Sequence, residues 1–184
     1  MGTFAKRFQN IGLLFITNSV FNQEYVFHRR LYAEIVMASL CHCIERQWFE
    51  LYAYVLMPNH IHLILKVNEN HTIEQILRDF KKFTAQQVLL TMRETDPDIL
   101  SRFWVGTRRQ KYELWRKDVD LKNVVTQEFL IQKAEYIHHN PLRAAWADSL
   151  GIREPQDYEY SSARFYLDGI EDKYVKLSDF RELL

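Results

Sequence analysis

The sequence predicts an α+β fold in which helices pack on one face of an antiparallel sheet. Segments typical of strands and helices follow in the order strand, helix, strand, strand, helix, strand, helix. Only Pro58 and Asn59 separate the two consecutive strands, and so short a connection joins antiparallel neighbours. No internal repeat or low-complexity segment interrupts this order. The order is that of the ferredoxin-like sandwich.

The first half of the chain predicts a strand, a helix and a hairpin. Residues 11–20 are rich in strand formers. Residues 29–47 follow with apolar side chains spaced about 3.6 residues apart, which predicts a helix. These side chains are Leu31, Ile35, Leu40 and Ile44. Residues 48–57 are apolar and aromatic, and His60 opens the second strand of the hairpin after the break at Pro58-Asn59.

The second half predicts two capped helices around one edge strand. Thr72 can cap a helix that ends at about Glu94, because Gln75 stands at the capping-box position. Its apolar stripe consists of Ile73, Ile76, Leu77, Phe80, Phe83 and Val88. Residues 95–110 contain Asp96-Pro97 and Gly106 and predict a loop, and residues 112–117 predict a strand at the sheet edge. Thr126 predicts the start of a last helix, which continues through about Asn140 and is terminated by Pro141.

Composition indicates one domain. The chain has 184 residues, of which 47% are hydrophobic and 14% aromatic, enough for one well-packed core but not for two large ones. We expect a main domain over residues 1–145 and an extension over residues 146–184 that packs on it. The extension is acidic, with nine Asp or Glu against five Lys or Arg, and we expect it to supply no chemistry.

Cysteine usage and hydropathy predict a cytoplasmic protein with no membrane partner. Cys41 and Cys43 are two apart in a predicted helix, so their side chains diverge and a disulfide between them is implausible. A zinc site at Cys41-His42-Cys43 would need a second ligand pair, which we do not find. No apolar run approaches the roughly 20 residues of a membrane helix, and the N-terminus has no signal-like apolar segment.

Charge argues against a protein that coats nucleic acid, because the formal net charge is zero. One segment departs from this balance: Glu113 is the only acidic residue between Arg102 and Lys117. The basic residues there are Arg102, Arg108, Arg109, Lys111, Arg116 and Lys117, interleaved with Phe103, Trp104, Tyr112 and Trp115. Such a segment either binds single-stranded nucleic acid or is a solvated loop beside core aromatic residues. Lys82 likewise either lies on a solvated helix face or contacts a phosphate.

His60 and His62 are the strongest candidates for a chemical site. Side chains alternate along a strand, so these two histidines share one face, and the apolar residues at the odd-numbered positions share the other. Those apolar residues are Ile61, Leu63 and Leu65. Taken alone, a His-x-His pair is more often a surface or core feature than a metal site. Tyr136 and Asn140, four apart on one helix face, would complete a site with a nucleophilic hydroxyl and an amide ligand.

These residues resemble a known family. Met57-Pro58-Asn59-His60-Ile61-His62-Leu63 resembles the HUH motif of single-tyrosine transposases, two histidines flanking a hydrophobic residue. Tyr136-Ile137-His138-His139-Asn140-Pro141 resembles their tyrosine helix. Together with Lys82-Phe83-Thr84 and Tyr160-Ser161-Ser162, the pattern is similar to the REP-associated tyrosine transposases. The resemblance extends from about residue 11 to residue 166.

The resemblance implies a metal-dependent endonuclease and transposase that cleaves and rejoins single-stranded DNA near hairpins through a 5'-phosphotyrosine. Residues 1–145 would be the HUH catalytic domain, with Tyr136 as the nucleophile. A divalent ion, Mg or Mn, would be held by His60, His62 and Asn140. The candidate DNA-binding residues are Lys82, Arg102, Trp104, Arg108, Arg109, Lys111 and Trp115.

Several questions stay open at this stage. The resemblance leaves both a monomer and a homodimer open. After the tyrosine helix, Ala145 stands where the family usually has glycine, which would change the following turn. One alternative function is a domesticated protein that binds hairpin DNA without cutting it. Another is a nickase of the replication-initiator or relaxase kind, although these usually carry further domains.

Overall fold

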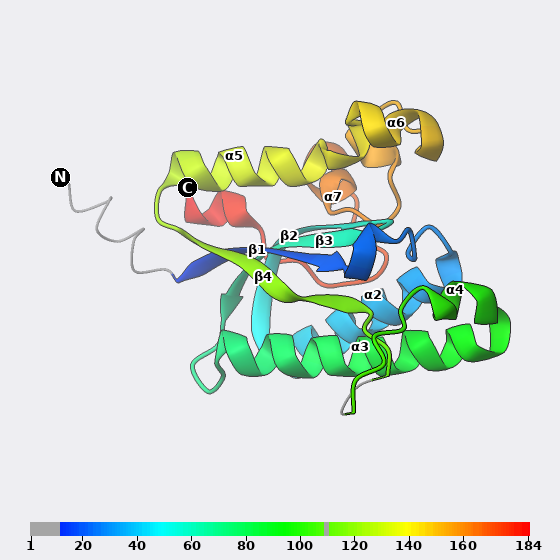
Figure 1. Ribbon diagram of the computed structural model, residues 1–184. Helices are drawn as coiled ribbons and strands as arrows, with labels where there is room; N and C mark the ends of the chain where they lie inside the picture. Colours follow the sequence, from blue (N-terminus) through cyan, green and yellow to red (C-terminus); the bar gives the residue numbers. More distant parts are fainter. Residues whose placement is uncertain (1–11, 109–110) are drawn as a thin grey trace.

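The protein is built around one four-stranded antiparallel sheet. The computed structural model describes residues 12–108 and 111–184. The strands are β1 (Leu13–Val20), β2 (Phe49–Met57), β3 (His60–Val67) and β4 (Trp115–Val124), in the spatial order β2-β3-β1-β4. Every neighbouring pair is antiparallel. The predicted α+β class and its antiparallel sheet are confirmed (Figure 1).

Helices cover both faces of this sheet. Helices α2 (Arg30–Glu45) and α3 (Ile73–Thr95) lie on one face, and α5 (Gln127–His138) lies on the other (Figure 1). The expectation that all helices share one face is therefore wrong. The central strands explain the difference, because nearly every side chain of β2 and most of those of β3 are buried. A strand buried on both faces needs packing partners above and below.

Local sequence signals explain where the long helices begin. The Thr72 hydroxyl accepts a hydrogen bond from the Gln75 amide, and Thr126 caps α5 in the same way through Phe129. The inward faces differ slightly from those predicted. Leu31 is exposed while Tyr32 is buried, and Phe83 is exposed on α3 beside the buried Thr84. Apolar spacing located these helices but not the exact rotation of each one.

Three boundaries differ from the sequence-based expectation. A short helix, α4 (Pro97–Ser101), interrupts the predicted loop, with a proline in its first turn where no amide donor is needed. Strand β4 starts later and runs longer than residues 112–117, and its many charged residues are tolerated because it is an exposed edge strand. Helix α5 ends at His138, so Asn140 opens a 3-10 turn, η2 (Asn140–Leu142), in keeping with the bias against helix before proline.

The C-terminal segment covers the outer edge of β2. Its elements are α6 (Ala144–Leu150), η3 (Pro155–Asp157), α7 (Ala163–Asp168) and η4 (Phe180–Leu183); a further turn, η1 (Phe21–Gln23), follows β1. The amides of Leu56 and Ser162 hydrogen-bond across to the Tyr160 and Tyr54 carbonyls, and the Ser178 amide reaches Leu51. The unpaired edge of β2 is thereby satisfied by the segment that follows α5.

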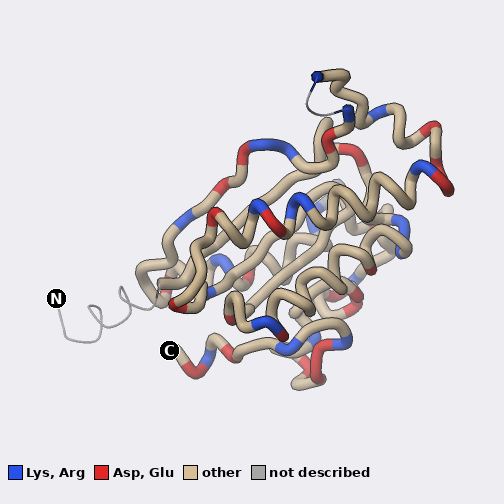
Figure 2. Tube along the Cα trace, turned by 90° about the horizontal axis from the view of Figure 1, so that it is seen from below, with Lys and Arg blue, Asp and Glu red and all other residues tan. Residues whose placement is uncertain are grey.

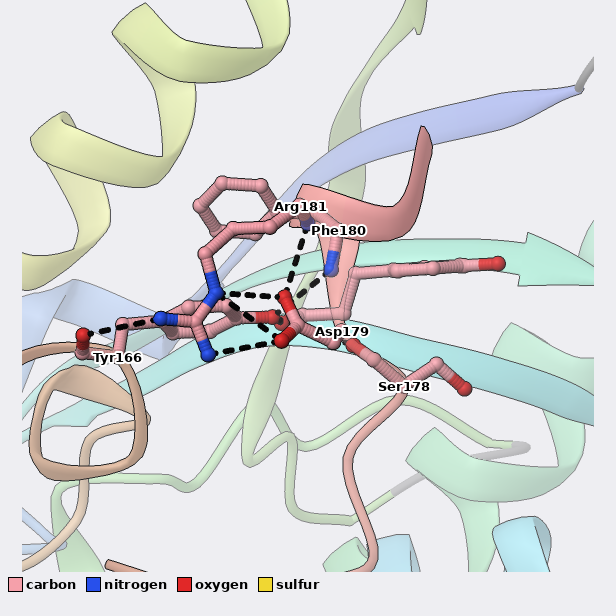
Figure 3. A network of polar contacts seen from close by, with 6 residues as sticks. Tyr166, Ser178, Asp179, Phe180 and Arg181 are labelled. Carbon is pink, nitrogen blue, oxygen red and sulfur yellow. Dashed lines mark hydrogen bonds and ion pairs between the residues drawn. The ribbon is translucent and has the colours of Figure 1, made fainter. Parts of the chain in front are cut away.

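Tyr166 fastens the end of the chain to the same strand. Its hydroxyl donates to the Tyr52 carbonyl at 2.5 Å and accepts from the Phe180 amide at 3.3 Å. Arg181 forms an ion pair with Asp179 at 2.7 Å and lies against the Tyr166 ring (Figure 3). The division of the chain at residue 145 stays a prediction. Across the described residues, no helix combines the length and apolar character that crossing a membrane requires.

Ser162 joins three parts of the fold through one buried hydroxyl, and its removal should be costly. The hydroxyl lies 3.0 Å from the Tyr54 amide, 3.2 Å from the Tyr54 carbonyl and 3.0 Å from His138 Nε2. We expect Ser162→Ala to lower the free energy of unfolding by about 1–3 kcal/mol, because buried polar partners lose their hydrogen bonds. Urea denaturation measures this. The exposed Ser101→Ala control should change stability by less than about 0.5 kcal/mol, and an equally small loss for Ser162→Ala would contradict the assignment.

Candidate active site

The sheet presents His60 and His62 to helix α5. In the register with β1, His62 lies opposite Thr17 and His60 opposite Ser19, on the same face as Phe15 and Ile64. The ring of Phe15 meets Tyr136 of α5 at 6.1 Å, so this is the face that α5 covers. The apolar residues that point to the other face of the strand are buried: Ile61, Leu63 and Leu65.

The two imidazoles and the tyrosine ring form a close cluster. The ring centres of His60 and His62 are 4.7 Å apart, and that of Tyr136 is 5.1 Å from His62. Phe15 stacks on His62 at 5.5 Å and closes the side away from His60. Residues separated by more than 70 positions in the sequence are thus brought into contact by the packing of α5 on β3.

Hydrogen bonds on the Nδ1 atoms orient both histidines. His60 Nδ1 lies 2.6 Å from Asn59 Oδ1, an oxygen that can only accept, so Nδ1 carries the proton and Nε2 keeps a lone pair. The Asn59 amide is itself fixed, since its Nδ2 donates to Gln23 Oε1 at 2.9 Å. His62 Nδ1 lies 2.8 Å from the Thr17 hydroxyl. Both rings are therefore held by the nitrogen that faces away from the site.

The Nε2 atoms of the histidines and the amide oxygen of Asn140 suit a divalent cation. His62 Nε2 and Asn140 Oδ1 are buried and have no hydrogen-bond partner among the described residues. The described parts of the chain contain no group of three His, Cys, Asp or Glu side chains that could hold a metal ion. The candidate donors are the two imidazoles and the amide oxygen of Asn140. Such a set fits a divalent ion and leaves coordination positions free for substrate.

Burial keeps the two histidines neutral. Desolvation lowers the pKa of His60 to about 4; the Asn140 side chain acts in the opposite direction, and the charge of Arg143 lowers the pKa further. Desolvation also lowers the pKa of His62 to about 3, with help from His60, Arg143 and Lys133. At neutral pH both rings are therefore available as ligands, because a protonated imidazole cannot bind a metal.

Two cations flank the tyrosine. The guanidinium of Arg143 lies 4.3 Å from the centre of the Tyr136 ring, and Lys133 Nζ lies 5.4 Å from it. The sequence-based reasoning did not assign either residue a role. Lys133 could have been found from its place three residues before Tyr136 on the same helix. Together they place two positive charges beside the tyrosine ring.

The first residue of the C-terminal extension packs close to His60. Trp146 of α6 is 8% exposed, and its ring centre lies 6.5 Å from that of His60. Its neighbour Ala145 replaces the usual glycine of the related family, and the chain still turns directly from η2 into α6. The expectation that residues 146–184 pack on the domain without supplying chemistry stays a prediction.

The candidate DNA-binding residues do not gather around Tyr136. Lys82 is exposed on α3, on the sheet face opposite α5 (Figure 1). Arg102 pairs with Glu24 at 3.1 Å. Trp104 is 54% exposed and packs edge-on against Tyr112. Arg108 and Lys111 are exposed on the connection before β4, and Arg109 lies outside the described residues.

Trp115 cannot serve as a surface for bases in this fold. It is 3% exposed, packs against Phe27 and Phe80, and donates its indole hydrogen to the Thr84 hydroxyl at 2.8 Å. The strand that it opens carries both basic and acidic residues, which are coloured in the view from the α2–α3 side (Figure 2). Of the two alternatives for the basic and aromatic segment, Trp115 therefore fits the one in which its aromatic residues belong to the core.

Comparisons with known proteins show what the whole chain is similar to. The family described as "Transposase IS200 like" matches residues 13–140. A solved structure of a REP-associated tyrosine transposase bound to a REP hairpin is similar at 18% identity and a TM-score of 0.62, over 92% of this chain and 89% of its own. A candidate transposase from Deinococcus radiodurans is more distant, at 19% identity and a TM-score of 0.48, over 69% of this chain and 88% of its own. None of the curated proteins matches the chain.

The buried histidines should make stability fall in mild acid. The pKa values of His60, His62 and His138 are lowered to about 4, 3 and 4, whereas an unfolded histidine titrates near its ordinary value of about 6.5. Below that value the unfolded chain binds more protons, so the free energy of unfolding falls as pH falls from 7 to 5. The limiting slope is about 1.4 kcal/mol per pH unit for each histidine.

Urea denaturation in EDTA at several pH values measures this slope. His138→Gln removes one of the three groups and should flatten the slope by about one third, whatever its effect on stability at pH 7. A free energy of unfolding that stays constant or rises between pH 7 and 5 would contradict the prediction.

Proposed function

The chain belongs to the IS200-like transposase family, and from this premise we propose that it is a metal-dependent enzyme that cleaves and rejoins single-stranded DNA near hairpins. The observation that carries the proposal is the contact of the Tyr136 ring with His62, which in turn contacts His60, both imidazoles being neutral at pH 7. A tyrosine beside two imidazoles whose ligand atoms are free is suited to covalent attack at a phosphate.

Tyr136 is the nucleophile in this proposal. Its hydroxyl oxygen forms a bond to phosphorus while the bond from phosphorus to the 3' oxygen breaks, and the proton lost by the tyrosine ends on that 3' oxygen. The products are a 5'-phosphotyrosine and a free 3' hydroxyl. Since the phosphodiester energy is retained, a 3' hydroxyl of another strand can reverse the step and rejoin the DNA.

The surrounding residues position and stabilise the reacting groups. Lys133 and Arg143 hold positive charge beside the tyrosine ring, where the negative phosphate must approach. His60, His62 and Asn140 are the residues that would hold a divalent ion, Mg or Mn. When bound, such an ion acts as a Lewis acid on the scissile phosphate. Phe15 and Trp146 shield the imidazoles from water on either side.

The substrate and assembly follow from the same reasoning. The similar REP-associated transposase binds a REP hairpin, and we propose a hairpin with a single-stranded flank as the substrate here. All four proposed site residues come from one chain, so a second copy is not required to complete the site. A homodimer stays a prediction that light scattering can check, and we propose a cytoplasmic location, where its DNA substrate lies.

Removal of the tyrosine hydroxyl should abolish covalent chemistry and leave binding intact. We expect Tyr136→Phe to form no covalent adduct with a hairpin-flanked oligonucleotide and to lose cleavage by several orders of magnitude, because no other group can form the ester. Denaturing gels show the adduct and gel shifts show the binding. Tyr174→Phe, a variant at a tyrosine that packs against Glu159 and Tyr160, should behave as the wild type.

The same assay separates the proposed enzyme from a domesticated DNA-binding protein. A wild-type protein that shifts the hairpin but never cleaves it with Mg or Mn would favour the binding protein. An adduct that persists in Tyr136→Phe would place the nucleophile elsewhere and contradict the mechanism.

Asn59 should govern metal affinity without touching the ion. Its Oδ1 fixes which nitrogen of His60 carries the proton, so Asn59→Ala should weaken Mn binding by about 10- to 100-fold. Asn59→Asp keeps the accepting oxygen and should weaken it less. Calorimetric titration with Mn measures the affinity, and the His60→Ala/His62→Ala variant gives the value without the site.

Asn68→Ala is the matched control, since its amide bonds a backbone carbonyl at the far end of β3. It should bind Mn as the wild type does. Equal affinities for Asn59→Ala and Asn68→Ala would remove the positioning role of Asn59, and full Mn binding by the double histidine variant would remove the metal assignment.

A further inference from the structure

A row of five aromatic rings runs from the tyrosine to the protein surface. The successive centres are 5.1, 4.7, 6.5 and 4.9 Å apart, in the order Tyr136, His62, His60, Trp146, Tyr25. The first four rings are buried or partly buried, but Tyr25 is 60% exposed. The row therefore ends in an open ring at the protein surface.

Tyr25 is held in place by the Trp146 ring and by the turn that precedes it in the chain. Its ring packs on Trp146, which is almost fully buried, so one part of the tyrosine is supported while the rest faces solvent. The chain just before it passes through Asn22 and Gln23 with positive φ angles of 54° and 58°. The Asn59 side chain holds this turn by donating to Gln23 Oε1 and to the Gln23 carbonyl. An exposed ring fixed in this way is preorganised for a flat partner.

A hollow beside Tyr25 offers room for that partner. Its volume is about 510 Å³, and Tyr25, Glu24, His28, Ile99 and Arg102 are among its lining residues. The Arg102 guanidinium is well exposed and pairs with Glu24, so the acidic charge next to Tyr25 is offset. Among the described candidate DNA-binding residues, Arg102 is the one that lines this hollow with Tyr25.

We infer that Tyr25, supported by Trp146, stacks a base of the single-stranded flank next to the phosphodiester that Tyr136 attacks. The inference rests on the proposed function and adds to it a subsite formed by the turn after β1 and the start of α6. Bases stack on aromatic rings whatever their identity, and Arg102 is in position for a neighbouring backbone phosphate. Trp146 is a positioning residue here, because it acts through Tyr25.

The experiment measures DNA binding in the Tyr136→Phe background, where no adduct can form. The probe is a hairpin oligonucleotide with a single-stranded flank, in which each flank nucleotide is replaced in turn by an abasic one. Tyr25→Leu should raise the Kd for the intact probe by about 5- to 100-fold, and Tyr25→Phe, which keeps the ring, should change it little. Phe83→Leu is the control for loss of an exposed ring on the opposite sheet face.

The abasic series identifies stacking rather than a general loss of affinity. At one flank position, removal of the base should raise the Kd of the protein that retains Tyr25 by the same factor as the Tyr25→Leu substitution does. In the Tyr25→Leu variant, removal of that base should not raise the Kd any further. Circular dichroism and the Tm of each variant show that it is folded. Tyr25→Phe shows whether the aromatic ring without its hydroxyl is enough for binding.

Two results overturn the inference while leaving the proposed function standing. The first is an unchanged Kd for Tyr25→Leu, as expected if Tyr25 contacts another protein. The second is an equal loss for intact and abasic probes at every position. If the Tyr136→Phe protein binds no hairpin probe at all, the proposed function fails and this subsite fails with it.

Discussion

The alternation of side chains along β3 is the constraint on which the rest of the structure depends. Ile61, Leu63 and Leu65 are buried on one face of that strand, so His60 and His62 must point to the other. Because the register with β1 is set by seven paired residues, the histidines cannot exchange faces without moving the whole apolar set out of the core. Helix α5 then needs only to pack on the second face to bring Tyr136 onto the imidazoles.

The packing of α5 on β3 buries polar atoms that lack hydrogen-bond partners. His62 Nε2 and Asn140 Oδ1 are buried without partners in the described part of the chain, an uncommon condition in a folded core. The Nδ1 atoms, in contrast, are bonded to Thr17 and Asn59. Local rules of polar satisfaction are expected to fail mainly at functional sites, and two of the buried unpaired atoms in the described residues belong to candidate metal ligands.

Much of the fold was predictable from local signals, and most of what was missed depends on tertiary packing. The caps at Thr72 and Thr126 and the turn at Pro58-Asn59 are short-range features, and each marked a boundary correctly. The position of α5 on the opposite face depends on how the helices share a sheet buried on both sides. Trp104 and Trp115 occur in one basic segment, yet one is exposed and the other lies in the core, a difference that composition cannot predict. Lys133 and Trp146 reach the site only through the packing of α5 and α6.

The central claim is that the histidine pair, the amide of Asn140 and the tyrosine form one metal-assisted centre within a single chain. The most direct measurement is the anomalous difference map from a crystal of the protein soaked with Mn. The account predicts one strong peak bonded to His60 Nε2, His62 Nε2 and Asn140 Oδ1, on the side of the imidazoles that faces Tyr136. A map without a peak there, or with Mn bound by other residues at full occupancy, would contradict it.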